Sequence, residues 1–144
     1  MSDPIRLGFV YVQNAGRSQM ATAFAERERA RRGLTDRVEI TTGGTQPAKA
    51  VHEEVIAAME EVGFDLSGRR PREITDAELA ACDHVATMGC STLDLDRDVR
   101  DWALDDPDGA SPERVREIRD EVERRVVALF DELFGPIETD ATDD

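Results

Sequence analysis

The chain reads FVYVQNAGRSQMA over residues 9–21, and this stretch decides the fold. It contains the end of a short apolar, partly β-branched run, which predicts a strand over residues 5–12. Residues 14–16 are Asn, Ala and Gly, which are small enough for a tight turn. A helix is expected to begin directly afterwards, at Arg17, so the stretch predicts a strand, a tight loop and a helix in immediate succession.

A loop in this position is suited to binding an anion. Unpaired backbone N–H groups and the positive end of the helix dipole converge on one point, where phosphate or a similar tetrahedral oxyanion binds. The Arg17 guanidinium can add a bidentate pair of hydrogen bonds to such an anion. The candidate oxyanion-binding residues are Val12, Gln13, Asn14, Ala15, Gly16, Arg17 and Ser18.

Strand and helix patterns alternate along the rest of the chain. Strands are expected at residues 38–42, 84–88 and 100–104, and helices at residues 17–32, 51–62, 76–81 and 112–134. Alternation of this kind implies right-handed crossovers between parallel strands. The sequence therefore predicts an α/β three-layer sandwich with a four-stranded parallel sheet, and a ligand beyond the carboxyl ends of the strands.

The length of the chain, 144 residues, is sufficient for one domain with its own core. We expect this domain to span residues 1–136, and residues 137–144 to form an acidic, disordered tail. The N-terminal residues do not resemble a signal peptide, and no run of about 18 apolar residues occurs. The expected location is the cytoplasm, without a membrane partner.

The composition is strongly acidic. Asp and Glu number 32 against 18 Lys and Arg, Lys49 is the only lysine, and the net charge is −14. This composition is typical of a protein that stays soluble in concentrated salt, so a halophilic source is expected; an ordinary acidic cytosolic protein is the alternative. In either case the surface repels phosphate backbones, and no nucleic-acid partner is expected.

Cysteine and histidine are too sparse to predict a metal site. Cys82 and Cys90 do not have the spacing of metal ligands, and two cysteines are too few for a secreted disulfide scaffold. His52 and His84 stand alone in the sequence. We therefore expect neither a metal nor another cofactor.

The loop resembles that of the low-molecular-weight protein tyrosine phosphatases and of the thioredoxin-coupled arsenate reductases that share their fold. Their pattern is Cys, five residues, Arg, and then Ser or Thr. Arg17 and Ser18 match the last two positions, Asn14 matches the loop asparagine, and Tyr11 stands where the family has its nucleophilic cysteine. The resemblance covers residues 5–134, implies the strand order 2-1-3-4 and, with the acidic composition, indicates a haloarchaeal type of member.

The resemblance also implies roles outside the loop. Asp106, which stands before a proline, falls on the family's general acid, although an Asp-Asp-Pro loop is otherwise a common surface turn. Cys90 follows the third predicted strand, as does the arsenate reductase cysteine that attacks the arsenylated nucleophile, releases arsenite and leaves a disulfide. The family's further cysteine is missing from residues 91–98, so the three-thiol relay is incomplete. The implied partners are phosphate, arsenate or sulfate and, for a reductase, a thiol reductant protein.

Tyr11 changes what this site can do. A phenol is almost fully protonated at neutral pH and is longer than a thiol, so we expect its ring to fill the loop and its hydroxyl to hydrogen-bond there. The catalytic candidates are Tyr11 at the nucleophile position, Arg17, Cys90 and Asp106. Three functions remain open: a phosphatase or arsenate reductase with little or no activity, a non-catalytic module that binds an oxyanion or phosphotyrosine, and a regulatory pseudophosphatase.

Overall fold

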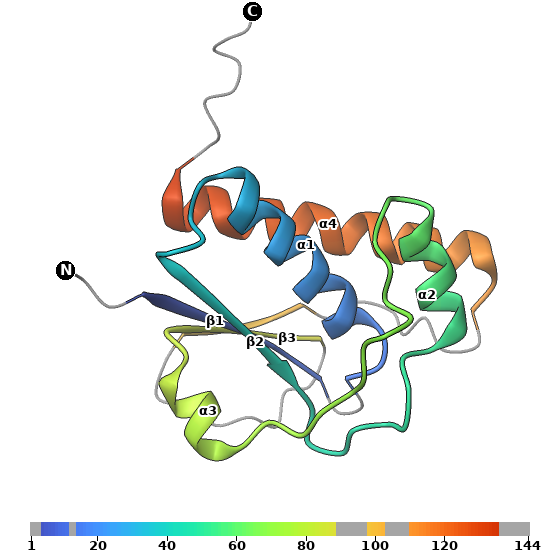
Figure 1. Cartoon of the computed structure of the whole chain (residues 1–144), viewed down its shortest axis with the longest axis horizontal. Coiled ribbons are helices and arrows are strands. Elements are labelled where there is room, and N and C mark those ends of the chain that lie inside the picture. Colours follow the sequence, from blue (N-terminus) through green and yellow to red (C-terminus); the bar gives the residue numbers. More distant parts are fainter. Residues whose placement is uncertain (1–3, 12–13, 89–97, 103–109, 136–144) are drawn as a thin grey trace, which may run out of the picture.

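The computed structural model of the chain describes residues 4–11, 14–88, 98–102 and 110–135. Within these ranges the strands are β1 (Ile5–Val10), β2 (Val38–Gly43), β3 (His84–Thr87) and β4 (Asp98–Asp101). The helices are α1 (Arg17–Arg31), α2 (Glu53–Glu60), α3 (Asp76–Ala81) and α4 (Pro112–Phe134). Figure 1 shows that β1 runs between its neighbours, with the long helices α1 and α4 side by side over the sheet.

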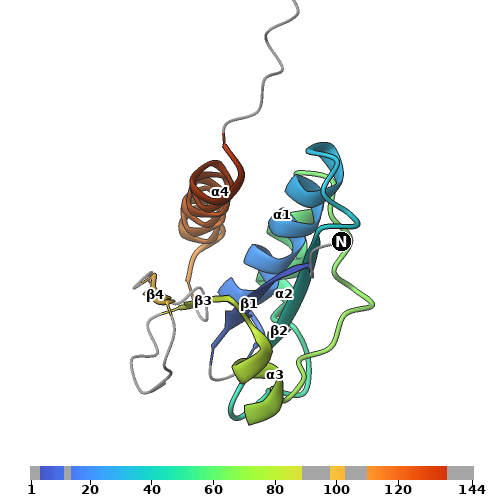
Figure 2. The ribbon, with the colours of Figure 1, turned by 90° about the vertical axis from the view of Figure 1, so that its left-hand side faces the viewer.

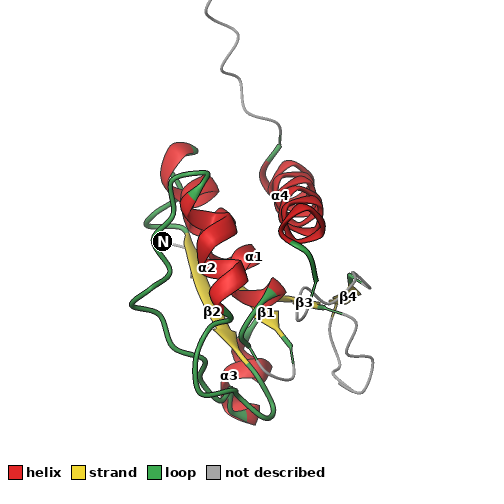
Figure 3. Cartoon of the chain, turned by 90° about the vertical axis from the view of Figure 1, so that its right-hand side faces the viewer, coloured by secondary structure: helices red, strands yellow, loops and turns green. Residues whose placement is uncertain are grey.

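The described strands pair in parallel, in the order β2-β1-β3-β4. Parallel neighbours require crossover connections, which place helices over the sheet. Figure 2 shows α1, α2 and α4 over one face and α3 against the other, and Figure 3 shows the same division from the opposite side. The predicted α/β class is confirmed.

The two faces of the sheet have separate apolar cores, because side chains alternate along each strand. On β1, Leu7 and Phe9 point into the larger core, which they share with Phe24 of α1 and Phe130 of α4. The smaller core, on the α3 side, consists of Val10, Ile74, Leu79, Cys82 and Val85. β1 is therefore buried on both faces. This packing holds the end of the strand, and with it the start of the following loop, in place.

Capping residues define the ends of three helices. The N–H of Glu78 donates to Oγ1 of Thr75 (3.1 Å), and the N–H of Thr75 donates to the Glu78 carboxylate (2.9 Å), which makes a complete capping box for α3. The N–H of Arg114 donates to Oγ of Ser111 at the start of α4 (3.2 Å). Gly33 follows α1 with a φ of +69°, a conformation that suits glycine at a helix end.

The last strand begins two residues before its predicted start, and residues 103–104 of the prediction lie outside the described residues. A strand was expected at residues 100–104, whereas β4 covers Asp98–Asp101 in register with β3, and the N–H of Trp102 continues the pairing by donating to the carbonyl of Thr87 (2.7 Å). The expectation followed the apolar residues from Trp102 onward. A strand at the edge of a sheet pairs through its backbone and needs few apolar side chains, so a polar segment takes this place.

Ion pairs join the charged face of α4 to the end of α2. Arg116 and Arg119 both donate hydrogen bonds to the Glu61 carboxylate, each at 2.9 Å. The hydrogen bond from Arg116, followed by that from Arg119, lowers the pKa of Glu61 to about 2.

In the described ranges, no helix is both long and apolar enough to cross a membrane.

Glu28 of α1 is buried, although it belongs to a run of four charged residues, 26–29. It is 0% exposed and forms ion pairs with Arg27 (3.0 Å), Arg31 (3.2 Å) and Arg32 (3.0 Å). Arg32 also reaches Asp131 of α4 (2.8 Å). The burial arises because this end of α1 packs against the end of α4, where a carboxylate is tolerated only with such partners.

Gly43, the last residue of β2, lies where another part of the backbone passes very close. A Cβ atom added there would lie 2.6 Å from the Cβ of Ile74 and 3.0 Å from its backbone nitrogen. The next residue, Gly44, exchanges hydrogen bonds with this segment, donating to the carbonyl of Arg72 (2.8 Å) and accepting from the N–H of Ile74 (3.1 Å). Glycine is needed at position 43 because the neighbouring backbone leaves no space for a side chain.

Gly43→Ala is expected to destabilise the protein by about 1–3 kcal/mol, because the new methyl group forces β2 away from Ile74. Denaturant unfolding followed by circular dichroism in concentrated KCl measures this change. Gly68→Ala is the matched control, since nothing lies within 4 Å of a Cβ at that position. Equal stability of the two variants would contradict the close approach.

Glu28→Ala is expected to cost about 3 kcal/mol, because it leaves the guanidinium of Arg32, whose side chain is 5% exposed, without its buried acid. Glu26→Ala removes the half-exposed pair with Arg69 on the same helix and is expected to cost less than about 1 kcal/mol. The same unfolding measurement compares them. A smaller loss for Glu28→Ala than for Glu26→Ala would contradict the buried cluster.

Candidate functional site

The loop between β1 and α1 begins at Tyr11, whose N–H donates to the carbonyl of Gly43 (3.2 Å). Asn14 has a φ of +52° and is the only non-glycine residue with a positive φ in the part of the chain that the structure describes. Asparagine adopts this left-handed conformation more readily than most residues. Gly16 precedes α1 and supplies no side-chain cap, so the first N–H groups of the helix point out of its end toward the loop.

The side-chain amide of Asn14 holds the loop. It is fully buried, and its Nδ2 donates to Oγ of Ser18 (2.9 Å) and to Oγ1 of Thr42 (2.9 Å). Its Oδ1 accepts from Nε2 of Gln19 (3.1 Å) and from the backbone N–H of Arg72 (3.1 Å). Two donors and two lone pairs are the full capacity of a primary amide, so the side chain is saturated.

This network reaches two more elements through Thr42 and Arg72. Oγ1 of Thr42 donates to the carbonyl of Phe9 in β1 (2.7 Å). The Arg72 guanidinium donates to the carbonyl of Thr42 (2.7 Å) and to the Glu78 carboxylate in α3 (2.6 Å). The hydrogen bond from the Thr75 N–H, and then that from Arg72, lowers the pKa of Glu78, so the acid stays ionised beside its arginine.

The side chains of Arg17 and Tyr11 contact each other. Arg17 is 3% exposed, and its guanidinium carbon lies 4.4 Å from the centroid of the Tyr11 ring, which is a cation–π contact. The predicted proximity of the ring to this arginine is confirmed. The guanidinium lies over the face of the ring, where the π electrons carry the negative charge. The hydrogen bond of the hydroxyl to loop N–H groups or to Arg17 stays a prediction.

The N-terminal end of α2 supports the loop from a further direction. The N–H of His52, which precedes α2, donates to the carbonyl of Ala15 (3.0 Å), and Ala15 itself is fully buried. The loop thus brings together the predicted residues Tyr11, Asn14, Ala15, Gly16, Arg17 and Ser18. The predicted residues Val12, Gln13, Cys90 and Asp106 lie outside the described residues.

Three residues of this network were not identified from the sequence: Gln19, Thr42 and Arg72. Thr42 stands near the carboxyl end of a predicted strand, next to a glycine pair, and a polar residue at that edge of a parallel sheet is a usable signal. Gln19 and Arg72 give no local signal, because their contacts to Asn14 depend on how the chain folds back on itself. Their role here is to hold the loop.

Proteins from other organisms are similar in sequence to almost the whole chain. The protein named "Putative arsenate reductase" in Halobacterium salinarum is 69% identical over 134 residues, which cover 91% of this chain and 94% of that protein. The glutaredoxin arsenate reductase of Synechocystis is 35% identical over 131 residues, which cover 85% of this chain and 93% of that protein. The similarity therefore extends over the sheet, the helices and the loop.

Solved structures show the same fold. An arsenate reductase in the phosphate binding state superposes with a TM-score of 0.76 at 33% identity, over 90% of this chain and 98% of that one. The family of low molecular weight phosphotyrosine protein phosphatases matches residues 6–135, from the first strand to the end of α4. Loop, sheet order and sequence thus agree, and the chain belongs to the low molecular weight phosphotyrosine protein phosphatase family.

Proposed function

We propose that the chain binds phosphate, arsenate or a similar oxyanion at the loop of residues 11–18, and that Tyr11 leaves it with little or no catalytic turnover. One observation carries the proposal. The buried Arg17 lies 4.4 Å from the ring of the residue that occupies the nucleophile position. A loop that keeps its cation but has no thiol at this position holds a ligand without bonding to it covalently.

Binding of an anion draws on three features of the loop. The helix dipole of α1 and the N–H groups of its first turn favour negative charge at this point. Asn14 fixes the loop in a conformation with a positive φ, which lets successive N–H groups converge. Arg17 contacts the Tyr11 ring through its guanidinium, and a guanidinium stacked in this way still directs N–H groups sideways, in its own plane.

Turnover requires a nucleophile that this loop lacks. In the family a thiolate bonds to phosphorus or arsenic, whereas a phenol remains protonated near neutral pH and its oxygen lies several bonds further from the backbone. In this proposal Asp106 and Cys90 keep the family positions of general acid and second thiol. Both act only during or after bond formation at position 11, so neither compensates for Tyr11.

The setting of the proposed function is a halophilic cytoplasm. The acidic composition and the relative from Halobacterium salinarum support this assignment. A thiol reductant protein is a partner only if the chain reduces arsenate, which is the activity for which its relatives are named. The same contact between Arg17 and Tyr11 favours the second candidate function, a non-catalytic module that binds an oxyanion or a phosphotyrosine side chain.

Tyr11→Cys is expected to raise p-nitrophenyl phosphate hydrolysis, or arsenate reduction with dithiothreitol, by at least about a thousandfold over the unchanged chain. The reason is that the helix N-terminus and Arg17 stabilise a thiolate at this position. The assays compare both chains in concentrated KCl, and calorimetry with inorganic phosphate measures binding alongside turnover.

Tyr11→Phe is the matched control for the phenol hydroxyl. It keeps the aromatic ring against Arg17 and is expected to match the unchanged chain in both assays. Activity in the unchanged chain that disappears in Tyr11→Phe would make the phenol a nucleophile and would contradict the proposal. A Tyr11→Cys chain that binds phosphate without turnover would favour the non-catalytic module.

Asn14→Ala is expected to lower the free energy of unfolding by about 2–4 kcal/mol and to weaken phosphate binding. The variant loses four hydrogen bonds and places an alanine at a positive φ. Asn14→Gly separates the two causes, because glycine accepts the conformation but makes no side-chain bonds. Phosphate affinity of Asn14→Gly equal to that of the unchanged chain would refute the role assigned to the network.

A further inference from the structure

Acidic residues are unevenly distributed in this chain. Although Asp and Glu number 32, the two longest runs without either are residues 4–25 and 40–52. A third run, residues 66–72, contains no acid and reads LSGRRPR, with three arginines. The first run includes the loop of the candidate site, and the other two belong to the connections before and after α2.

The fold brings these three runs together at the carboxyl end of the sheet. His52 donates to the carbonyl of Ala15 in the loop (3.0 Å), and the N–H of Arg72 donates to the side chain of Asn14 (3.1 Å). Gly44 bonds to the carbonyl of Arg72 (2.8 Å), which joins the two connections to each other. Segments 44–52 and 66–72, called the basic rim below, therefore lie beside the candidate site.

Some cations of the basic rim have no acidic partner among the residues that the structure describes. Most described arginines are in ion pairs, and those of the rim include Arg69 with Glu26 (2.6 Å) and Arg72 with Glu78 (2.6 Å). Among the residues that the structure describes, the only arginine and lysine side chains without a hydrogen bond or ion pair are those of Arg37, Lys49 and Arg70, and all three residues are exposed. Two of the three belong to the rim.

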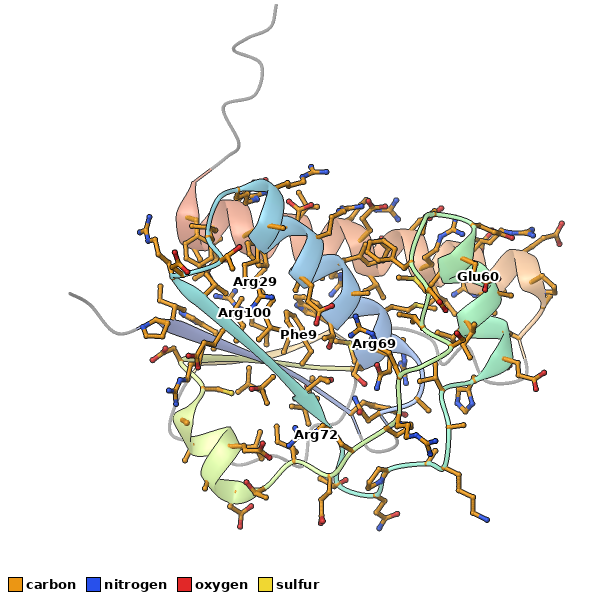
Figure 4. All side chains as sticks on the ribbon, in the orientation of Figure 1. Phe9, Arg29, Glu60, Arg69, Arg72 and Arg100 are labelled. Carbon is orange, nitrogen blue, oxygen red and sulfur yellow. The ribbon has the colours of Figure 1, made fainter. Side chains whose placement is uncertain are left out.

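Figure 4 shows Arg69 and Arg72 on the connection between α2 and α3, with Arg72 at the end of β2. Arg37 directly precedes β2, whereas Gly44 directly follows it, so Arg37 lies at the opposite end of the sheet. Six strand residues separate the two ends by about 20 Å. Lys49 and Arg70, the unpaired cations of the rim, therefore lie at the same end of the sheet as the candidate site.

We propose that the basic rim is a docking surface for an acidic polypeptide segment that reaches the neighbouring loop. A net charge of −14 makes most of this protein repel such a segment, so exposed cations without internal partners select where it binds. Docking itself does not require an oxyanion in the loop. The placement of a phosphorylated side chain of that segment in the loop rests on the proposed function.

Screening explains why the occupant is a polypeptide rather than a free oxyanion steered from a distance. In salt of about 1 M the Debye length is about 3 Å, so Lys49 and Arg70 act only on groups in direct contact. An inorganic oxyanion bound in the loop contacts the loop, whereas an extended segment also covers the rim. A nucleic acid is the less suited polyanion, because its long phosphate backbone extends over the acidic remainder of the surface.

The test uses a fluorescein-labelled peptide of about ten residues, rich in Asp and Glu, with either tyrosine or phosphotyrosine at its centre. Fluorescence anisotropy measures its affinity at the lowest KCl concentration at which circular dichroism shows the folded chain. Both peptides are expected to bind, the phosphorylated one more tightly. The double variant Lys49→Glu with Arg70→Glu weakens both by about tenfold, since each reversal turns an attraction into a repulsion.

Arg37→Glu is the matched control, because it reverses an equally exposed, unpaired cation at the other end of the sheet and is expected to change affinity by less than about twofold. Equal losses for the control and the rim variant, no loss for either, no binding of the acidic peptide, or tighter binding of a single-stranded oligonucleotide would each overturn the proposal. Unfolding midpoints of all variants verify that they fold.

The two proposals fail in different ways. If the loop does not bind oxyanions, inorganic phosphate gives no heat and phosphotyrosine adds nothing to the affinity, while the unphosphorylated peptide still depends on the rim. If the rim does not dock a segment, phosphate still binds and the charge reversals leave peptide affinity unchanged.

Discussion

Four hydrogen bonds of one side-chain amide, that of Asn14, connect the candidate site to the rest of the fold. They join the loop to the start of α1, to the end of β2 and to the segment that leads to α3. Because the amide is buried and saturated, a shift of any of these elements leaves a polar group unpaired at a cost of about 1–3 kcal/mol. The conformation of the loop from Asn14 to Ser18 is therefore held by the sheet and its crossovers.

Charged side chains are arranged differently at the two ends of helix α1. Near the C-terminal end of α1, Glu28 forms ion pairs with three arginines, and one of them, Arg32, also pairs with Asp131 of α4. At the N-terminal end of α1, the positive charge of the buried Arg17 adds to the positive end of the helix dipole. The proposed binding of an anion by a protein with a net charge of −14 draws on this arginine, because a buried cation is less screened than the surface carboxylates.

Local sequence signals predicted most of the fold. The loop after the first strand, the capping residues Thr75 and Ser111, and the glycine at the end of α1 follow from short-range rules of turn and cap chemistry. Long-range packing was not accessible in this way: β4 is polar because it pairs by its backbone, and Glu28 is buried because α4 covers it. For the site, the sequence identified the loop and Tyr11, whereas Thr42 and Arg72 join it only through tertiary contacts.

Tyr11 is the only tyrosine in the chain, so ¹³C labelling of tyrosine rings reports on this residue alone. An NMR titration with inorganic phosphate then measures whether position 11 lies in the oxyanion site. A saturable shift of the ring signals, together with the amide signals of residues 14–18, is the predicted result, and Arg17→Gln abolishes it. Ring signals that stay fixed while phosphate saturates a site elsewhere on the protein would contradict the assignment of this loop.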